Sequence, residues 1–556
     1  MQLINGLHFN NIRGDIYGGL TAAVVALPLA LAMGVASGAG PIAGIYGAIF
    51  VGFFAALIGG TPAQVSGPTG PMTVVMALIF TEYTAMFPND PQLGATLAFT
   101  IVVMGGLFQI GFGVLKIGKF IELVPHPVVS GFMSGIGVII ILIQIGPMFG
   151  HVSSAKPLEA ARAIGSVVSD PHQASLLLAV LVLLIVYGVP RFLPKLNRLM
   201  PSPLLALIVG TVCYILFFKG TGVAILGEIP TGLPDPMMPT LSWDLLPGMI
   251  SSALILAALG AIDSLLTSLV ADNVTKTYHK SDRELIGQGI GNTIAGLFGG
   301  LPGAGATMRT VVNVKAGGQT PISGALHAVI LLAIVLGAGG LASEIPKAVL
   351  AGILIKVGTD IIDWEYLGRL RHVPKAGIIL MLTVLFMTVF VDLIMAVATG
   401  MIMASMLFLQ RVTNLQLSSM VIGNVTSEEL ELNSEEAQVL TDAKQRVVFF
   451  RIGGAISFGA AKGMAKKVSG FKDYDVLIID MTEVPVIDYS AGRSLDSIIE
   501  DAIAAGREVM MVGVRSGVTK TLKKQKVLDR IHSDYVFVKR IGALREALSY
   551  VKTKTA

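Results

Sequence analysis

An aspartate stands inside a long apolar run, where an acidic side chain is costly. Asp263 lies within residues 257–272, AALGAIDSLLTSLVAD, and a carboxylate at the centre of a membrane helix costs about 2.5–3.5 kcal/mol on insertion scales. Thr267 follows four residues later and therefore lies on the same helical face. A carboxylate with a hydroxyl one turn away is a set of hard oxygen atoms that suits a small cation. If the backbone is unwound at Gly305 and Thr307, their carbonyl groups complete the shell for Na⁺.

Two other interpretations of Asp263 stay open. A buried aspartate can exchange a proton, in which case the coupling ion would be H⁺. It can also be structural, with its carboxylate accepting hydrogen bonds from broken backbone nearby.

The second chemical feature is a pair of stretches that break membrane helices. Residues 299–310, GGLPGAGATMRT, and residues 59–75, GGTPAQVSGPTGPMTVV, both open with Gly-Gly-x-Pro. Each predicts a half span that begins after the Gly-rich turn, at residues 306–316 and 70–86. Paired interrupted spans in the two halves of a membrane chain indicate a transporter's binding site.

The two half spans also predict a site for a small anion. If they come from opposite sides, their N-termini meet near the midplane, with about half a positive charge at each. Unpaired N–H groups at such ends bind anions, and the hydroxyls of Thr69 and Thr307 would add donors. The alternative is that these residues are N-caps of packed helices without a ligand.

Other polar residues of the apolar region have less specific patterns. Arg309, in the first turn of the second half span, either adds charge to the anion site or bonds to broken backbone and a neighbouring acid. Gln109 and Gln144 predict hydrogen bonds between helices. Asp392 is expected to be solvated at a helix junction.

The composition indicates a membrane protein with a soluble tail. Of 556 residues, 53% are hydrophobic and only 14% are charged, and charge concentrates after Arg411. A net charge of +4, scattered along the chain, argues against nucleic acid as a partner. The single Cys213 excludes a disulfide framework. The eight His residues show no metal spacing, and neither a P-loop nor a catalytic constellation is present. We therefore expect a secondary transporter, not an enzyme, with neither a cofactor nor a transition metal.

Apolar windows of about 17–25 residues predict about fourteen spans. Two of them are the half spans, third and tenth in order. An odd number of spans in each half predicts a 7+7 inverted repeat, over residues 14–218 and 246–410. The predicted spans are 15–35, 42–58, 70–86, 93–115, 127–148, 173–189, 202–218, 246–269, 284–299, 306–316, 322–340, 347–360, 375–391 and 393–410.

The distribution of Lys and Arg predicts the orientation of the chain. With a cytoplasmic N-terminus, the inner loops hold most of these residues, as the positive-inside rule requires. An even number of spans then places the tail in the cytoplasm as well. The outer loops hold Lys156, Arg162, Lys219 and Lys347.

The tail alternates strand and helix patterns. Residues 445–452, 475–481 and 508–514 predict buried strands, and residues 490–505 and 519–528 predict helices. Such alternation indicates a small α/β domain. The predicted division is therefore a transmembrane domain at 1–410, a linker at 411–429 and a cytoplasmic domain at 430–556.

Four stretches of the chain resemble the sulfate permease (SulP) family of anion transporters, which carry a C-terminal STAS domain. GAIDSLLTSLVADNVTKT, ELIGQGIGN and GGLPGAGATMRTVVN are similar to its BicA-type branch of Na⁺-dependent bicarbonate transporters, and DMTEVPVIDYSA is similar to STAS domains. The resemblance implies a uracil-permease-like fold with core and gate domains, and a homodimer.

The resemblance also implies site residues. It places Na⁺ at Asp263, Thr267, Gly305 and Thr307. It places bicarbonate at Thr69, Ala306 and nearby backbone, where Gly70 begins the first half span. Proton-coupled relatives tend to have Glu at the position of Asp263, so Na⁺ coupling is the first expectation.

Ser490 occupies the position that is phosphorylated in the STAS domains of anti-sigma antagonists. A regulatory phosphorylation site and a plain helix N-cap are both open for this residue.

The expected function is therefore Na⁺-coupled bicarbonate symport across the bacterial cytoplasmic membrane. The alternatives are a proton-coupled sulfate or dicarboxylate transporter of the same family, a passive anion channel, and a membrane-anchored signalling scaffold whose function resides in the tail.

Overall fold

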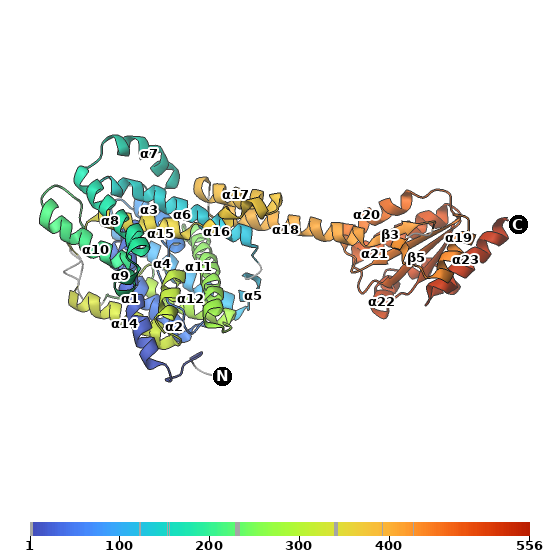
Figure 1. Cartoon of the computed structure of the whole chain (residues 1–556), viewed down its shortest axis with the longest axis horizontal. Coiled ribbons are helices and arrows are strands. Elements are labelled where there is room, and N and C mark those ends of the chain that lie inside the picture. The colour runs from blue at the N-terminus through green and yellow to red at the C-terminus, as the bar shows by residue number, and fades with distance from the viewer. Residues whose placement is uncertain are drawn as a thin grey trace. The chain divides into compact units, whose positions relative to one another are not determined.

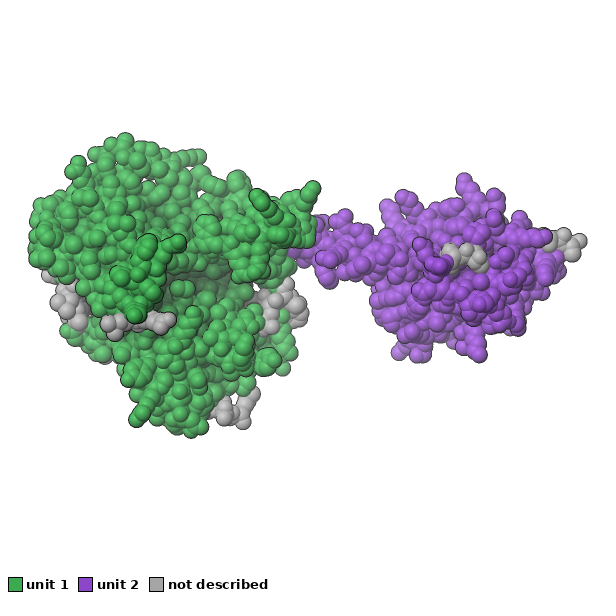
Figure 2. Space-filling view, viewed as in Figure 1, with its two compact units in different colours: residues 1–401 green, residues 402–556 purple. Residues whose placement is uncertain are grey.

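The computed structural model describes residues 4–121, 124–152, 154, 156–227, 234–338, 343–391, 393–425 and 428–555. Asp392 and residues 426–427 of the predicted linker lie outside this set. The chain forms two compact units, Met1–Met401 and Ile402–Ala556 (Figure 2). We refer to them as unit 1 and unit 2.

Unit 1 consists of apolar helices whose ranges follow the predicted spans closely (Figure 1). Helices α11 and α18 are longer than predicted at their C-terminal ends. The helices are α1 (Ile12–Ala36), α2 (Pro41–Ile58), α3 (Gly70–Met86), α4 (Pro91–Val114), α6 (His126–Met148), α8 (Gln173–Phe192), α10 (Ser202–Cys213), α11 (Leu246–Thr275), α12 (Ser281–Leu297), α13 (Thr307–Lys315), α14 (Pro321–Ala338), α15 (Lys347–Ile361), α17 (Lys375–Phe390) and α18 (Leu393–Ser418).

Shorter helices connect these elements. They are α5 (Gly118–Ile121), α7 (Pro157–Ser169), α9 (Pro194–Leu199), α16 (Trp364–Gly368) and the π-helical turn Tyr214–Phe218. Helix α7 was not predicted, because its sequence is too short and too polar to be a span. Seven described helices are long and apolar enough to cross a membrane by length and composition alone. The total of fourteen spans stays a prediction.

The helices of unit 1 pack in two groups. In the first, α12 packs against α2 and α4, α14 packs against α1 and α2, and α11 packs against α4 and α13. Small residues allow close approach of these helices: a Cβ placed on Gly289 would lie 2.6 Å from the carbonyl oxygen of Gly106. In the second group, α6 packs against α15 and α17, and α8 packs against α10 and α15. Helices α1 and α3 of the first group contact α15 and α6 of the second.

Unit 2 is a five-stranded sheet with helices on both faces. The strand order is β3-β4-β5-β6-β7, with β3 antiparallel to β4 and the remaining pairs parallel. Helices α20, α21 and α22 cover one face and α19 and α23 the other (Figure 1). The strands are β3 (Met420–Gly423), β4 (Val447–Gly453), β5 (Val476–Glu483), β6 (Glu508–Val512) and β7 (Val536–Phe537), and the helices are α19 (Ser434–Asp442), α20 (Phe458–Ser469), α21 (Tyr489–Ala504), α22 (Ser516–Lys524) and α23 (Arg540–Thr555).

Part of the predicted linker, residues 411–429, forms regular structure. Helix α18 continues to Ser418, and strand β3 then joins the sheet as its edge strand. The apolar pattern of the last span ends near residue 410, but the helix continues beyond it within unit 2, where the Gln416 side chain accepts a hydrogen bond from Ser457 at 3.0 Å.

Candidate ion-binding site

A short antiparallel strand pair joins the two broken spans. Strand β1 (Ser66–Gly67) pairs with β2 (Ala304–Gly305). The N–H of Ala306 extends this pairing by donating to the carbonyl oxygen of Val65 at 2.9 Å. The pair satisfies backbone groups that a broken helix leaves unbonded, and it fixes the register of the two breaks.

The two half helices begin directly after the strand pair. Helix α3 starts at Gly70 with Thr69 as its N-cap, and α13 starts at Thr307 with Ala306 as its N-cap. Because the strands are antiparallel, the helices leave them in opposite directions. Their N-termini therefore meet, as the sequence predicts, and both contribute positive partial charge to one place.

Ala306 differs from its predicted role as an anion-binding residue. Its N–H is committed to Val65, and its carbonyl oxygen accepts from the N–H of Thr310 at 2.8 Å. Ala306 therefore has no backbone donor to offer an anion in this structure. The donors at this end belong to the first turn of α13, which begins at Thr307.

At the other end, Thr69 has a buried hydroxyl that lies within interaction range of the Asp263 carboxylate. Its side chain is buried, makes no capping bond, and its Oγ1 has no hydrogen-bond partner in the described part of the chain. The alternative of a hydrogen-bonded N-cap is therefore not what the structure shows. A buried unsatisfied hydroxyl calls for an explanation, and a ligand at the meeting point of the helices supplies one.

The structure brings three of the predicted cation ligands into direct contact. The hydroxyl of Thr267 donates to the carbonyl oxygen of Gly305 at 2.9 Å and shares a hydrogen bond of 2.7 Å with the hydroxyl of Thr307. Ser264, not predicted, accepts from the N–H of Gly305 at 3.1 Å. Helix α11 is thereby fixed to the second break through its hydroxyl face.

Asp263 lies one turn before Thr267 on the same helix. The residue is 6% exposed, and its Oδ2 has no hydrogen-bond partner in the described part of the chain. The Thr69 side chain lies within hydrogen-bonding range of this carboxylate, and the guanidinium of Arg309 lies near enough to act on its charge. A buried carboxylate on the same helical face as Thr267, whose hydroxyl contacts Gly305 and Thr307, fits a small cation held by oxygen atoms.

Arg309 connects the two breaks. It is buried, and its Nη2 donates to the carbonyl oxygen of Pro68 at 2.6 Å. A Cβ placed on Gly67 would lie 2.8 Å from its Nη1. Of the two interpretations left open by the sequence, the structure therefore shows the bond to broken backbone with an acid nearby.

Sequence reasoning missed a polar face on α12. Glu284, Gln288 and Asn292 follow one another at intervals of four residues and are buried. The Glu284 carboxylate accepts from the N–H groups of Gly60 and Thr61 at 2.8 and 2.9 Å, and Gln288 donates to it at 2.8 Å. This face supplies the partners that the first break lacks.

Asn292 does the same for the second break. Its side chain accepts from the N–H of Gly303 at 2.7 Å and donates to the Gly303 carbonyl at 2.9 Å. It also donates to Gln109 at 2.9 Å, which confirms the predicted interhelical bond of Gln109. The sequence did contain a signal for this polar face, because the polar residues of α12 recur every four positions within a predicted span.

Gln144 does not follow its prediction. Its side chain is 6% exposed, and within the described residues it forms no hydrogen bond to a neighbouring helix.

Ser490 is not the N-cap of its helix. Asp488 is the N-cap of α21, and its Oδ1 accepts from the N–H of Ala491 at 2.8 Å. Ser490 lies in the first turn with its side chain exposed. The N-cap interpretation is therefore wrong, because the acceptor two residues earlier already fills that place.

Comparison with known proteins extends the description to the whole chain. The sulfate permease family model matches residues 12–384, and the STAS domain model matches residues 438–539. The chain is 43% identical to the bicarbonate transporter BicA of Synechocystis sp. over 549 residues, covering 99% of this chain and 96% of that protein.

Solved structures that resemble the chain include two that cover most of it. The transmembrane domain of a cyanobacterial bicarbonate transporter BicA matches with a TM-score of 0.66 and 49% identity, covering 71% of this chain and all of that one. The structure of SLC26A9 matches with a TM-score of 0.81, covering 98% of this chain and 91% of that one. At 17% identity, the second match shows the fold alone.

Paired half helices within a bundle of apolar helices, followed by a STAS domain, define a multi-pass membrane transporter. This chain belongs to the sulfate permease family. The predicted fold class, a polytopic helical membrane protein with an α/β STAS domain, is thereby confirmed.

Proposed function

We propose that this protein is a secondary active transporter that couples the influx of Na⁺ to the uptake of bicarbonate. One observation carries the proposal: the buried Asp263, with an unpartnered oxygen, lies beside the junction of two half-helix N-termini. The similarity to bicarbonate transporters over nearly the whole chain supports bicarbonate as the anion.

In the proposed site the two ions use different atoms of the same breaks. Na⁺ takes the carboxylate of Asp263, the hydroxyls of Thr267 and Thr307, and the carbonyl oxygen of Gly305. Bicarbonate takes the hydroxyl of Thr69 and the N–H groups at the starts of α3 and α13, Gly70 among them. The anion thus sits at the positive ends of two helices.

The coupling is electrostatic in this proposal. Bound Na⁺ neutralises Asp263, so the field of the two helix ends acts on the anion without an opposing carboxylate. The anion in turn stabilises the cation, and by linkage each ion must raise the affinity of the other by the same factor. Alternating access then requires only that the two helix groups of unit 1 move against each other with the site intact.

Uptake of labelled bicarbonate into proteoliposomes tests the proposal. We expect accumulation with an inward Na⁺ gradient and little uptake when choline replaces Na⁺. Equal uptake under both conditions, or accumulation of sulfate instead of bicarbonate, would contradict it.

A proton-coupled sulfate or dicarboxylate transporter is the second candidate, because the family model is that of sulfate permeases and an aspartate can exchange protons. A pH gradient would then drive uptake without Na⁺. A passive anion channel would show flux but no accumulation against a gradient.

The proposal includes the bacterial cytoplasmic membrane, with the N-terminus and the STAS domain in the cytoplasm, and a homodimer. Ser490 is its proposed regulatory site, since the exposed hydroxyl is open to a kinase. Mass spectrometry of the purified protein, with Ser490→Ala as control, would detect the phosphate.

A further inference from the structure

A cavity of about 410 Å³ lies apart from the ion site, between the two helix groups of unit 1. Its walls are the C-terminal ends of α1 and α6, the outer part of α3, and the starts of α8 and α15. Thr81 of α3 lines it, eleven residues beyond Gly70, which is about 16 Å along a helix. The cavity and the ion site are therefore two separate places along the same helix, α3.

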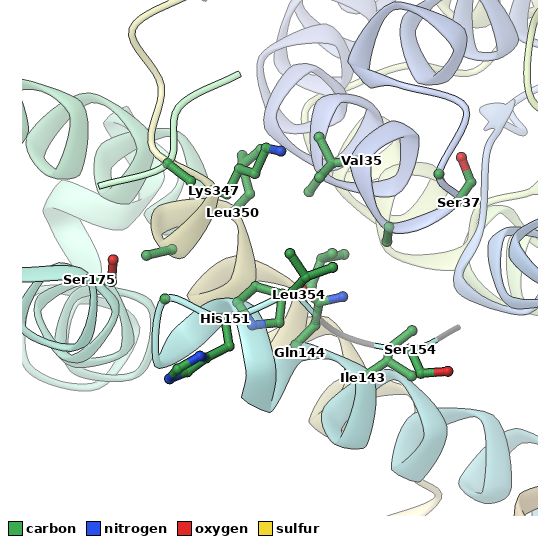
Figure 3. Close-up of a pocket in the computed structure, with 18 of the residues that line it drawn as sticks. Val35, Ser37, Ile143, Gln144, His151, Ser154, Ser175, Lys347, Leu350 and Leu354 are labelled. Atoms are coloured by element: carbon green, nitrogen blue, oxygen red, sulfur yellow. The ribbon is translucent and has the colours of Figure 1, made fainter. Parts of the chain in front are cut away.

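Gln144 faces this cavity without a partner. Figure 3 shows its side-chain amide directed into the space between the helices. The residue is 6% exposed, and its amide has no hydrogen bond within the described part of the chain. The amide is therefore available to bond with a molecule in the cavity.

The charge at the cavity is positive. Lys347 lines it and is exposed, and the described residues include no acidic partner for its ammonium group (Figure 3). Lys347 is also the first residue of α15, so the positive end of that helix forms the same wall. Two acids near the lining residues are paired with other cations: Glu159, which accepts from Ser154 at 2.7 Å, pairs with Lys156 at 3.4 Å, and Glu344 pairs with Lys219 at 3.0 Å.

An apolar contact joins the start of half helix α3 to the two helices α6 and α15 that line the cavity. Ile140 lies one turn before Gln144 on the same face of α6, and Ile361 lies seven residues after Leu354, which lines the cavity, on α15. A Cβ placed on Gly70, the first residue of α3, would lie 2.8 Å from Cδ1 of Ile140 and 2.7 Å from Cδ1 of Ile361. These two side chains therefore pack against the start of the half helix, and they belong to helices that line the cavity.

We propose that this cavity is an outer vestibule that binds the transported anion weakly before it reaches the half helices. Lys347 and the start of α15 attract the anion, and the amide of Gln144 donates to it. Ile140 and Ile361 form the closed contact that must part for the anion to pass. The identity of the anion rests on the proposed function, whereas the vestibule needs only that the anion is negatively charged.

The single native Cys213 makes a direct test simple. In a Cys213→Ala background, Gln144→Cys is labelled in intact cells with methanethiosulfonate reagents of equal size, one anionic and one cationic. We expect the anionic reagent to react faster, and Lys347→Gln to lower the ratio of the two rates about fivefold, the effect of one nearby charge in a watery site. Val35→Cys, on the α1 wall (Figure 3), repeats the test with Gln144 intact.

Lys219→Gln is the matched control, because Lys219 lies on the same side of the protein but pairs with Glu344 at 3.0 Å. It should leave the rate ratio unchanged. Equal rates for the two reagents at both cysteines, or labelling only in inside-out vesicles, would overturn the proposal.

Transport kinetics separate this proposal from the proposed function. Lys347→Gln should raise the KM for the anion about fivefold and leave kcat unchanged, whichever cation drives uptake. If Na⁺ drives bicarbonate uptake but the anionic and cationic reagents react equally fast, the proposed function stands and the vestibule proposal fails. If the anionic reagent reacts faster but protons drive uptake, the vestibule proposal stands and the proposed function fails.

Discussion

The two broken spans share a sequence pattern and a strand pair, yet they place different groups at the site. The first break, residues 59–75, has no charged residue, and the hydroxyl of Thr69 forms no hydrogen bond of good geometry among the described residues. The second break contributes Arg309, and its Gly305 carbonyl is bonded to Thr267 of α11. The first break is thus uncharged, whereas the second carries Arg309 and is hydrogen-bonded to helix α11.

This difference indicates a division of roles between the two halves. A free hydroxyl and helix N–H groups are donors, which suit an anion, whereas hydroxyl and carbonyl oxygens around a carboxylate suit a cation. The repeat supplies two similar breaks, and residues outside the repeat pattern, above all Asp263, make them unequal. Substitutions at the two breaks should therefore affect the two ions differently.

The largest effect is expected at the carboxylate. Asp263→Asn should weaken Na⁺ stimulation of uptake by more than about 100-fold, because even outer-shell partners of bound metals contribute about 10- to 100-fold. The half-saturating Na⁺ concentration in proteoliposomes measures it. Asp272→Asn, on the same helix but bonded to His279, is the control and should keep the stimulation; a similar loss in both would remove Asp263 from the site.

A smaller effect is expected at the connection between the breaks. Arg309→Gln removes the charged hydrogen bond to Pro68, which should lower the free energy of unfolding by about 1.5–3 kcal/mol. The thermal unfolding midpoint of the protein in detergent should fall, and uptake should fall with it. An unchanged midpoint would show that Arg309 does not hold the two breaks together.

The smallest effects are expected at the hydroxyls, and they test the comparison most finely. Thr69→Val should raise the half-saturating bicarbonate concentration about 2- to 10-fold at saturating Na⁺, the range expected for one neutral hydrogen bond. Thr267→Val should instead raise the half-saturating Na⁺ concentration at saturating bicarbonate. If both variants changed the half-saturating concentration of the same ion, the two breaks would not be specialised for different ions.

Much of the fold follows from local sequence. The spans are long apolar runs, and the two breaks are marked by Gly and Pro, so their positions depend only on nearby residues. The strand pair was not predicted, but the meeting of the half helices was, because their repetition in an inverted arrangement requires it. Thr267 was also predicted to lie near the carbonyl groups of Gly305 and Thr307; in the structure it contacts the Gly305 carbonyl but the hydroxyl of Thr307.

What was missed depends on partners far along the chain. Glu284 and Asn292 serve backbone groups of loops that the sequence alone does not bring near α12. The N–H of Ala306 is unavailable to an anion because it donates to the carbonyl oxygen of Val65, which lies far from it in the sequence. Strand β3 lies in the predicted linker because an edge strand of only four residues is too short to show the alternating pattern that predicts a strand.

The binding of each ion as a function of the other tests the central claim most directly. Titration calorimetry of the purified protein should show bicarbonate affinity rising with Na⁺, and Na⁺ affinity rising with bicarbonate by the same factor. In Asp263→Asn both dependences should disappear. Bicarbonate affinity that is independent of Na⁺ in the unmodified protein would contradict a shared site at the two breaks.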